Sequence, residues 1–187
     1  MIDRRAFLAA AGAGFGAAFL HADPIQVEAS LRHARDSAAP PLEVLTPEQA
    51  ADVEAVAAQI IPTDDLPGAR EARVASFADH SLTTWAANQR NQLIRGLDAF
   101  NTAVGQHYPG QRFAQLAPDQ QLEYLRANDH DGFFQQMIFI TLVGTFSHPD
   151  WGGNYDKAGW RILGFEDRYV WQPPFGWYDD KANGGPN

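Results

Sequence analysis

The stretch DGFFQQMIFITLVGTF, residues 131–146, decides the fold class of this chain. Between Met137 and Val143 it is apolar on nearly every side, and a helix without a polar face belongs in the interior of a protein. Alternating apolar and polar runs joined by Asn-Gly or Asp-Gly turns, the signature of β-hairpins, do not occur. We therefore expect an all-α protein: a small irregular helical bundle with extended N-terminal and C-terminal arms, built around this central helix.

The helix with the clearest predicted boundaries lies in LTPEQAADVEAVAAQIIP, residues 45–62. Thr46 is expected to cap it, Pro47 to take its first position and Gln49 to complete a capping box. Pro62 is expected to end it. One face carries the apolar residues at helical spacing: Val53, Val56, Ala57, Ile60 and Ile61.

Further helices are expected between this helix and the central one in the sequence. Apolar spacing predicts helix at residues 74–85 and 93–104, either as two helices or as one continuous helix stopped by Pro109 and Gly110. A shorter helix is expected in FAQLAPDQQLEYLRAN, beginning at Pro118. Residues 46–165 together form the expected helical domain.

Composition excludes several classes of function. The chain has 187 residues, enough for one domain with extensions, and 14 Lys and Arg against 23 Asp and Glu give it a net charge of −9. An acidic surface repels phosphate backbones, so no nucleic acid is expected as a partner. The absence of cysteine excludes disulfides, thiolate metal sites and a catalytic thiol.

The N-terminus, MIDRRAFLAAAGAGFGAAFLHAD, has the pattern of a twin-arginine export signal. Arg4 and Arg5 precede Phe7 and Leu8, and a small-residue apolar run continues to Leu20. That run is shorter than the ~20 residues needed to span a bilayer. Residues 1–22 are therefore predicted to be an export signal read by the twin-arginine translocase, which places the protein in the periplasm. Residues 23–45 are expected to form an arm or linker.

The C-terminal segment, residues 166–187, loses helical periodicity and intersperses aromatic residues among prolines and glycines. Such a segment cannot bury its aromatic rings in a helix or a central strand. It either folds back over its own domain or buries these rings on a partner, because aromatic anchors are favoured at protein interfaces. The rings in question are Tyr169, Trp171, Phe175, Trp177 and Tyr178.

Candidate catalytic groups are few. Asp64 and Asp65 could form a carboxylate pair, and His148 could act as an acid or base with Asp150, as in a stand-alone exported hydrolase or metal-dependent enzyme. The alternative for the aspartates is a turn, because PTDDLPG is typical of a segment that caps the next helix. No pair of histidines has the helical spacing of a metal site.

The stretch FSHPDWGGNYDKAGWRILGF, residues 146–165, admits a catalytic and a structural interpretation, and the structural one explains more of its residues. Gly152 and Gly153 would supply a turn, and Asn154 or Asp156 would cap a short helix in KAGWRIL. The residues expected to return to the core after this helix are Leu163 and Phe165.

Several segments together resemble the gluconate 2-dehydrogenase subunit 3 family. They are the Arg4-Arg5 start, LTPEQAADVEAVAAQIIPTDDLPGAREARV from Leu45, FAQLAPDQQLEYL from Phe113 and GTFSHPDWGGNYDKAGWRILGF from Gly144. The similarity covers about residues 45–165.

The resemblance implies a non-catalytic small subunit with no catalytic, cofactor-binding or metal-binding residue of its own. A large subunit of the glucose-methanol-choline oxidoreductase type would carry FAD and oxidise a sugar or sugar acid, and a multihaem cytochrome c would take the electrons onward. The small subunit would escort the folded large subunit through export and remain bound. Its expected partner interface comprises the five arm aromatics with Trp151, Tyr155 and Trp160.

Overall fold

The computed structural model describes residues 41–167. The predicted export signal, most of the N-terminal arm and the aromatic residues of the C-terminal arm lie outside these residues. The described chain contains α-helices and short 3-10 helices and no strand, which confirms the all-α prediction. No helix within residues 41–167 is both long and apolar enough to cross a membrane.

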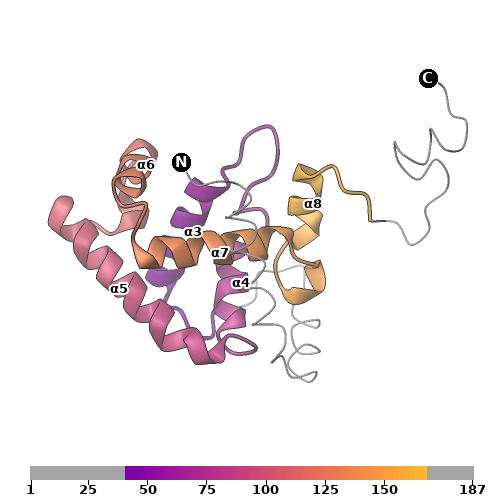
Figure 1. Cartoon of the computed structure of the whole chain (residues 1–187), viewed down its shortest axis with the longest axis horizontal. Helices are drawn as coiled ribbons and strands as arrows, with labels where there is room; N and C mark the ends of the chain where they lie inside the picture. The colour runs from indigo at the N-terminus through magenta and orange to yellow at the C-terminus, as the bar shows by residue number, and fades with distance from the viewer. Residues whose placement is uncertain (1–40, 168–187) are drawn as a thin grey trace, which may run out of the picture.

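Six α-helices form the domain (Figure 1). The helix α7 runs through its middle, with α5 and α6 toward one end and α8 at the other (Figure 1). Contacts join α7 to the helices α3, α4, α5 and α8. Their bounds are α3 Pro47–Ile60, α4 Val74–Ser81, α5 Arg90–His107, α6 Pro118–Ala127, α7 Gly132–Phe146 and α8 Ala158–Ile162.

The helix α3 begins as its sequence predicts. The Thr46 hydroxyl accepts a hydrogen bond from the Gln49 backbone N–H at 3.2 Å, and the Gln49 side-chain oxygen accepts from the Thr46 N–H at 3.1 Å. This reciprocal pair satisfies two N–H groups that have no partner within the helix. Pro118 likewise occupies the first turn of α6, where a proline loses no helical hydrogen bond.

The region between α4 and α5 settles an alternative that the sequence left open. The two helices are separate, because α4 ends at Ser81 and a series of turns follows. The hydroxyls of Thr83 and Thr84 donate to the His80 carbonyl at 2.9 and 3.1 Å, and the Arg90 guanidinium donates to the Leu82 carbonyl at 2.9 Å. Carbonyls that a longer helix would use are thereby taken, because hydroxyl side chains compete with the helical ladder.

The helix α7 is central as predicted, but it is not equally buried on all sides. Phe133, Met137 and Thr141 face the core, where the Phe133 ring lies 4.9 Å from the ring of Phe100 on α5. Phe134 and Ile138 are only half-buried. One side of this apolar helix therefore contributes to the protein surface.

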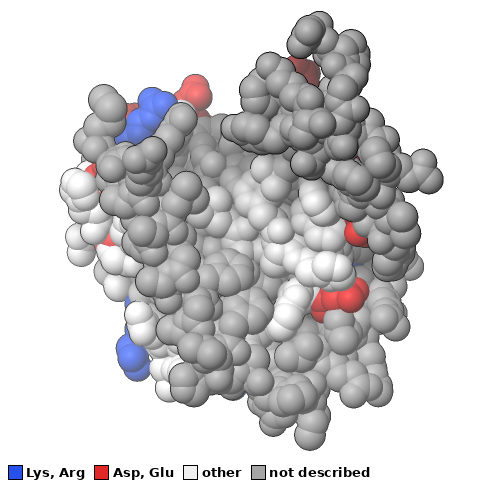
Figure 2. All heavy atoms as spheres, turned by 45° about the vertical axis from the view of Figure 1, so that its right-hand side comes forward, with Lys and Arg blue, Asp and Glu red and all other residues white. Residues whose placement is uncertain are grey.

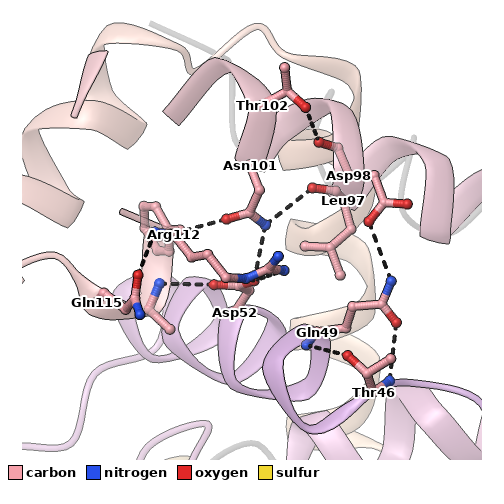
Figure 3. Close-up of polar contacts among 11 residues, drawn as sticks. Thr46, Gln49, Asp52, Leu97, Asp98, Asn101, Thr102, Arg112 and Gln115 are labelled. Carbon is pink, nitrogen blue, oxygen red and sulfur yellow. Dashed lines mark hydrogen bonds and ion pairs between the residues drawn. The ribbon is translucent and has the colours of Figure 1, made fainter. Parts of the chain in front are cut away.

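A buried polar network connects α3, α5 and the segment before α6 (Figure 3). Asp52 on α3 is fully buried and accepts hydrogen bonds from the Arg112 guanidinium, from the Asn101 amide at 3.0 Å and from the Ala114 N–H at 2.9 Å. The Asn101 side-chain oxygen accepts from the Phe113 N–H at 3.0 Å. Because a buried charge must be paired and hydrogen-bonded, this network fixes α3, α5 and the 112–114 segment relative to one another.

One prediction about the end of the domain is wrong. Leu163 and Phe165 do not return to the core: their exposed fractions are 63% and 50%. After the last turn of α8, Gly164 adopts a left-handed φ of 63°, and the N–H of Phe165 donates to the Trp160 carbonyl at 2.8 Å. This is a Schellman-type ending, and it turns both side chains toward the surface.

Candidate partner-binding site

The segment between α7 and α8, residues 147–157, has the most unusual backbone in the described chain. Asn154, Asp156 and Lys157 have φ values of 48°, 51° and 57°, and Gly152 has a φ of 90°. Left-handed φ is uncommon outside glycine, and residues held in such conformations cluster at functional sites. We call this segment the Gly-Asn turn.

Asn154 holds the turn together from inside. Its side chain is fully buried, its amide donates to the Ser147 carbonyl at 2.9 Å, and its oxygen accepts from the Gly159 N–H at 2.7 Å. The sequence left the cap of the following helix to Asn154 or Asp156. Neither is the N-cap residue of α8, which is Lys157, but the Asn154 oxygen accepts from the first turn of α8, whereas Asp156 is exposed and pairs with Arg161 at 3.0 Å.

Glycines allow the turn and α8 to press against the end of α7. A Cβ on Gly153 would overlap the Gly144 carbonyl, and one on Gly159 would overlap the Thr145 carbonyl. The turn is also attached to the segment before α4, because Tyr155 donates its N–H to the Ala72 carbonyl at 3.3 Å. The Tyr155 ring also lies 3.3 Å beneath the Arg73 guanidinium, a cation–π contact. The turn is therefore a rigid platform.

Three aromatic rings contact one another in series across the Gly-Asn turn and α8. The His148 ring lies 5.4 Å from the Trp160 ring, and the Trp160 ring lies 5.1 Å from that of Phe165, both edge to face. The Trp160 indole N–H donates to the Phe146 carbonyl at 3.3 Å, which fixes the middle ring. Figure 2 shows uncharged described residues in the middle of the visible face, with acidic side chains beside them on the right.

The interface residues predicted within the domain lie in the Gly-Asn turn and in α8. Trp151, Tyr155 and Trp160 belong to the Gly-Asn turn and to α8, and each is half-buried. Sequence analysis missed the exposed pair Leu163 and Phe165, which it assigned to the core. The glycine after Leu163 is the signal that could have indicated a helix ending there. The five arm aromatics lie outside the described residues.

The candidate catalytic residues are not assembled. Asp64 and Asp65 are exposed in the loop after α3, where the Asp64 carboxylate accepts from the Leu66 N–H at 2.8 Å, as in a turn. In the same loop, hydrogen bonds from the Thr63 hydroxyl and the Gly68 N–H lower the pKa of Glu71.

His148 is joined to neither aspartate of that loop by a hydrogen bond or an ion pair. Its Nδ1 lies 3.5 Å from an Asp150 carboxylate oxygen and 3.3 Å from the Asp150 backbone nitrogen. Within residues 41–167, no group of three or more His, Asp or Glu side chains is placed to hold a metal ion.

A second apolar surface lies on the exposed side of α7. It is a groove of about 420 Å³ between the end of α3, the helix α6 and α7. Sequence analysis did not predict it, because it arises where two amphipathic helices fail to cover one side of an apolar helix. Its apolar lining consists of Ile60, Ile61, Leu122, Leu125, Phe134, Ile138 and Leu142.

Within residues 41–167, the fold and the site define a class of protein: a small all-α domain that presents a firmly anchored turn and exposed apolar side chains. The family described as gluconate 2-dehydrogenase subunit 3 matches residues 47–167, and the chain belongs to this family. The resemblance seen in the sequence motifs is thereby confirmed. The family is that of a subunit of a dehydrogenase complex, which agrees with an accessory role. Searches of curated proteins and of solved structures found no significant match.

Proposed function

We propose that this chain is the non-catalytic small subunit of a periplasmic, FAD-dependent sugar or sugar-acid dehydrogenase of the glucose-methanol-choline type. It escorts the folded catalytic subunit through twin-arginine export and then stabilises it. The observation that carries this proposal is the family match over residues 47–167. In this assignment FAD and the chemistry belong to the large subunit, and a multihaem cytochrome c accepts the electrons.

Two features of the chain support the escort role. Arg4 and Arg5 stand at the start of an apolar run, as in signals that direct folded proteins to the twin-arginine translocase. The platform at α8 offers Trp151, Tyr155 and Trp160 as contacts, and the arm aromatics extend the predicted interface beyond the described residues. A partner without its own signal could then cross the membrane bound to this chain.

The first experiment asks whether the partner exists. The chain carries an affinity tag, is co-expressed with its genomic neighbours and is purified from the periplasm. Co-purification of a large subunit with flavin absorption in the visible blue supports the proposal. A chain that purifies alone, with the neighbours expressed and folded, contradicts it.

The second experiment tests the escort role itself. The double substitution Arg4→Lys and Arg5→Lys is expected to keep both proteins in the cytoplasm, although only this chain is altered. Arg32→Lys with Arg35→Lys, in the arm that follows the signal, is the matched control and leaves export unchanged. If the large subunit still reaches the periplasm when Arg4 and Arg5 are changed, the escort role is wrong.

A further inference from the structure

The N-terminal end of the described chain is held on α4 by one carboxylate. Asp79, only 3% exposed, accepts hydrogen bonds from the backbone N–H groups of Glu43, Val44 and Leu45 at 2.7, 2.9 and 2.7 Å. Charge-assisted hydrogen bonds of this kind are about twice as strong as neutral ones. The chain therefore enters the domain at a defined point, and 40 residues precede the described part.

This entry point lies beside the Gly-Asn turn. The Glu43 carboxylate lies 3.4 Å from Nδ1 of His80, the residue after Asp79. The other edge of the His80 ring faces the turn, since a Cβ placed on Gly152 would lie 3.7 Å from His80 Cδ2. His80 thus packs between the entering chain and the turn.

The C-terminal end of the described chain is held at the same turn. Asp167, the last described residue, pairs with Lys157 of the turn at 3.0 Å. Phe165 packs on Trp160, which is tied to the end of α7 through the Phe146 carbonyl. Twenty further residues, 168–187, continue from this point. Both arms therefore leave the domain around one turn.

Large apolar side chains are exposed at this place, among charged ones. Four large apolar residues are exposed in residues 41–167, and three of them belong to these two chain ends: Leu42, Leu163 and Phe165. The fourth, Leu66, lies in the loop after α3. We call Leu42, Leu163 and Phe165, together with the Gly-Asn turn, the exit surface.

Two pairs of opposite charges lie at the exit surface. Lys157 pairs with Asp167, and Arg161 pairs with Asp156, each at 3.0 Å. The acidic side chains of Glu43 and Glu166 are also exposed at the two chain ends. The exposed side chains of Leu42, Leu163 and Phe165 fit an apolar patch on a partner, which is the usual composition of the centre of a protein interface, and the charged side chains fit its polar rim.

We infer that the exit surface is where this chain binds the large dehydrogenase subunit. The inference rests on the proposed function and adds the location and chemistry of the interface. The groove between α3, α6 and α7 is the competing surface, and it lies outside this contact.

The test uses full-length chains co-expressed with the large subunit, and it measures flavin absorbance per small chain and the affinity of the purified pair. Leu163→Ser with Phe165→Ser is expected to weaken binding about tenfold or more, as loss of central anchors does, and Leu42→Ser is expected to weaken it less. Leu66→Ser is the matched control, an exposed leucine in the loop after α3 that belongs to neither chain end, and leaves binding unchanged. Leu122→Ser, in the groove, also leaves binding unchanged. Circular dichroism verifies that each variant is folded.

The outcomes separate the two proposals. The wild-type chain and the variant with Leu163→Ser and Phe165→Ser could capture the flavoprotein equally well. In that case the exit surface is not the interface, and the proposed function stands. The exit surface is also wrong if only Leu122→Ser weakens binding, because the groove would then be the interface. If the wild-type chain captures no flavoprotein, the proposed function and the exit surface are both wrong.

Discussion

At the scale of single residues, three buried polar side chains hold segments of the domain in place. Asp52, Asp79 and Asn154 are each nearly or fully buried, and each accepts hydrogen bonds from backbone N–H groups. A buried polar group without a partner is costly, so each of these residues permits one local arrangement of the chain. None belongs to a motif that indicates chemistry.

Replacing Asp52 tests the network in Figure 3. Asp52→Asn removes the charge that faces Arg112 and is expected to lower the free energy of unfolding by about 3 kcal/mol, measured by urea denaturation. The control is Asp98→Asn, because the Asp98 carboxylate is exposed and accepts one hydrogen bond, from the Gln49 amide at 3.3 Å. Its expected effect is within about 0.5 kcal/mol. Equal effects of the two substitutions would contradict the structural role of Asp52.

Asn154 allows hydrogen bonding and backbone strain to be measured separately. Asn154→Ala loses both side-chain hydrogen bonds and keeps the left-handed φ, so a loss of about 2–4 kcal/mol in unfolding free energy is expected. Asn154→Gly also loses the hydrogen bonds but relieves the backbone, so it should be less destabilising by about 1 kcal/mol. An alanine variant as stable as the glycine variant would show that strain contributes nothing here.

At the scale of elements, helix starts with a capping residue or a proline could be predicted from the sequence. A helix end set by side-chain hydrogen bonds to the last carbonyls could not. The cap at Thr46 and the proline at Pro118 act within a few residues, so α3 and α6 begin where the sequence indicates. The end of α4 depends on Thr83, Thr84 and Arg90 side chains that bind helix carbonyls, and periodicity does not reveal such bonds. The apolar pattern of α7 predicted its central position but not its surface-facing side.

The contact between α7 and α8 depends on glycine. Gly159→Ala would place a Cβ on the Thr145 carbonyl, so α8 is expected to separate from α7 while the other helices stay folded. Hydrogen exchange should show lost protection confined to α8 and the Gly-Asn turn. Gly105→Ala in α5 is the control, because a Cβ there has room, and it should stabilise the domain by about 0.5–1 kcal/mol. Unchanged protection in the Gly159 variant would disprove the close packing.

At the scale of the whole molecule, a helical domain has its own core while its two arms leave around one turn. The rings of Phe100, Phe113, Tyr124 and Phe133 pack on one another within residues 41–167. Stability of the domain is therefore expected to be independent of residues 168–187, whereas binding is not.

A chain ending at Asp167 tests this separation. It keeps the Lys157–Asp167 ion pair, so its helical circular dichroism spectrum and melting temperature should match those of the full chain. Its affinity for the large subunit should fall about tenfold or more, because the arm aromatics are lost as anchors. A truncated chain that fails to fold would show instead that these aromatics complete the domain's own core.

The sequence by itself determined the all-α class, the positions of α3, α6 and α7, and the family, because caps, helical periodicity and short motifs act over a few residues. Only the tertiary structure decided what Asn154 and the glycines at the contact between α7 and α8 are for, since their partners lie at the end of α7 and on α8. The outward direction of Leu163 and Phe165 follows from the ending of α8 at Gly164, a local signal that the sequence contains. The tertiary structure also decided that both ends of the described chain meet at one turn. Hydrogen bonds and packing between residues far apart in the chain set the structure of the turn and this meeting of the ends, and no local pattern encodes them.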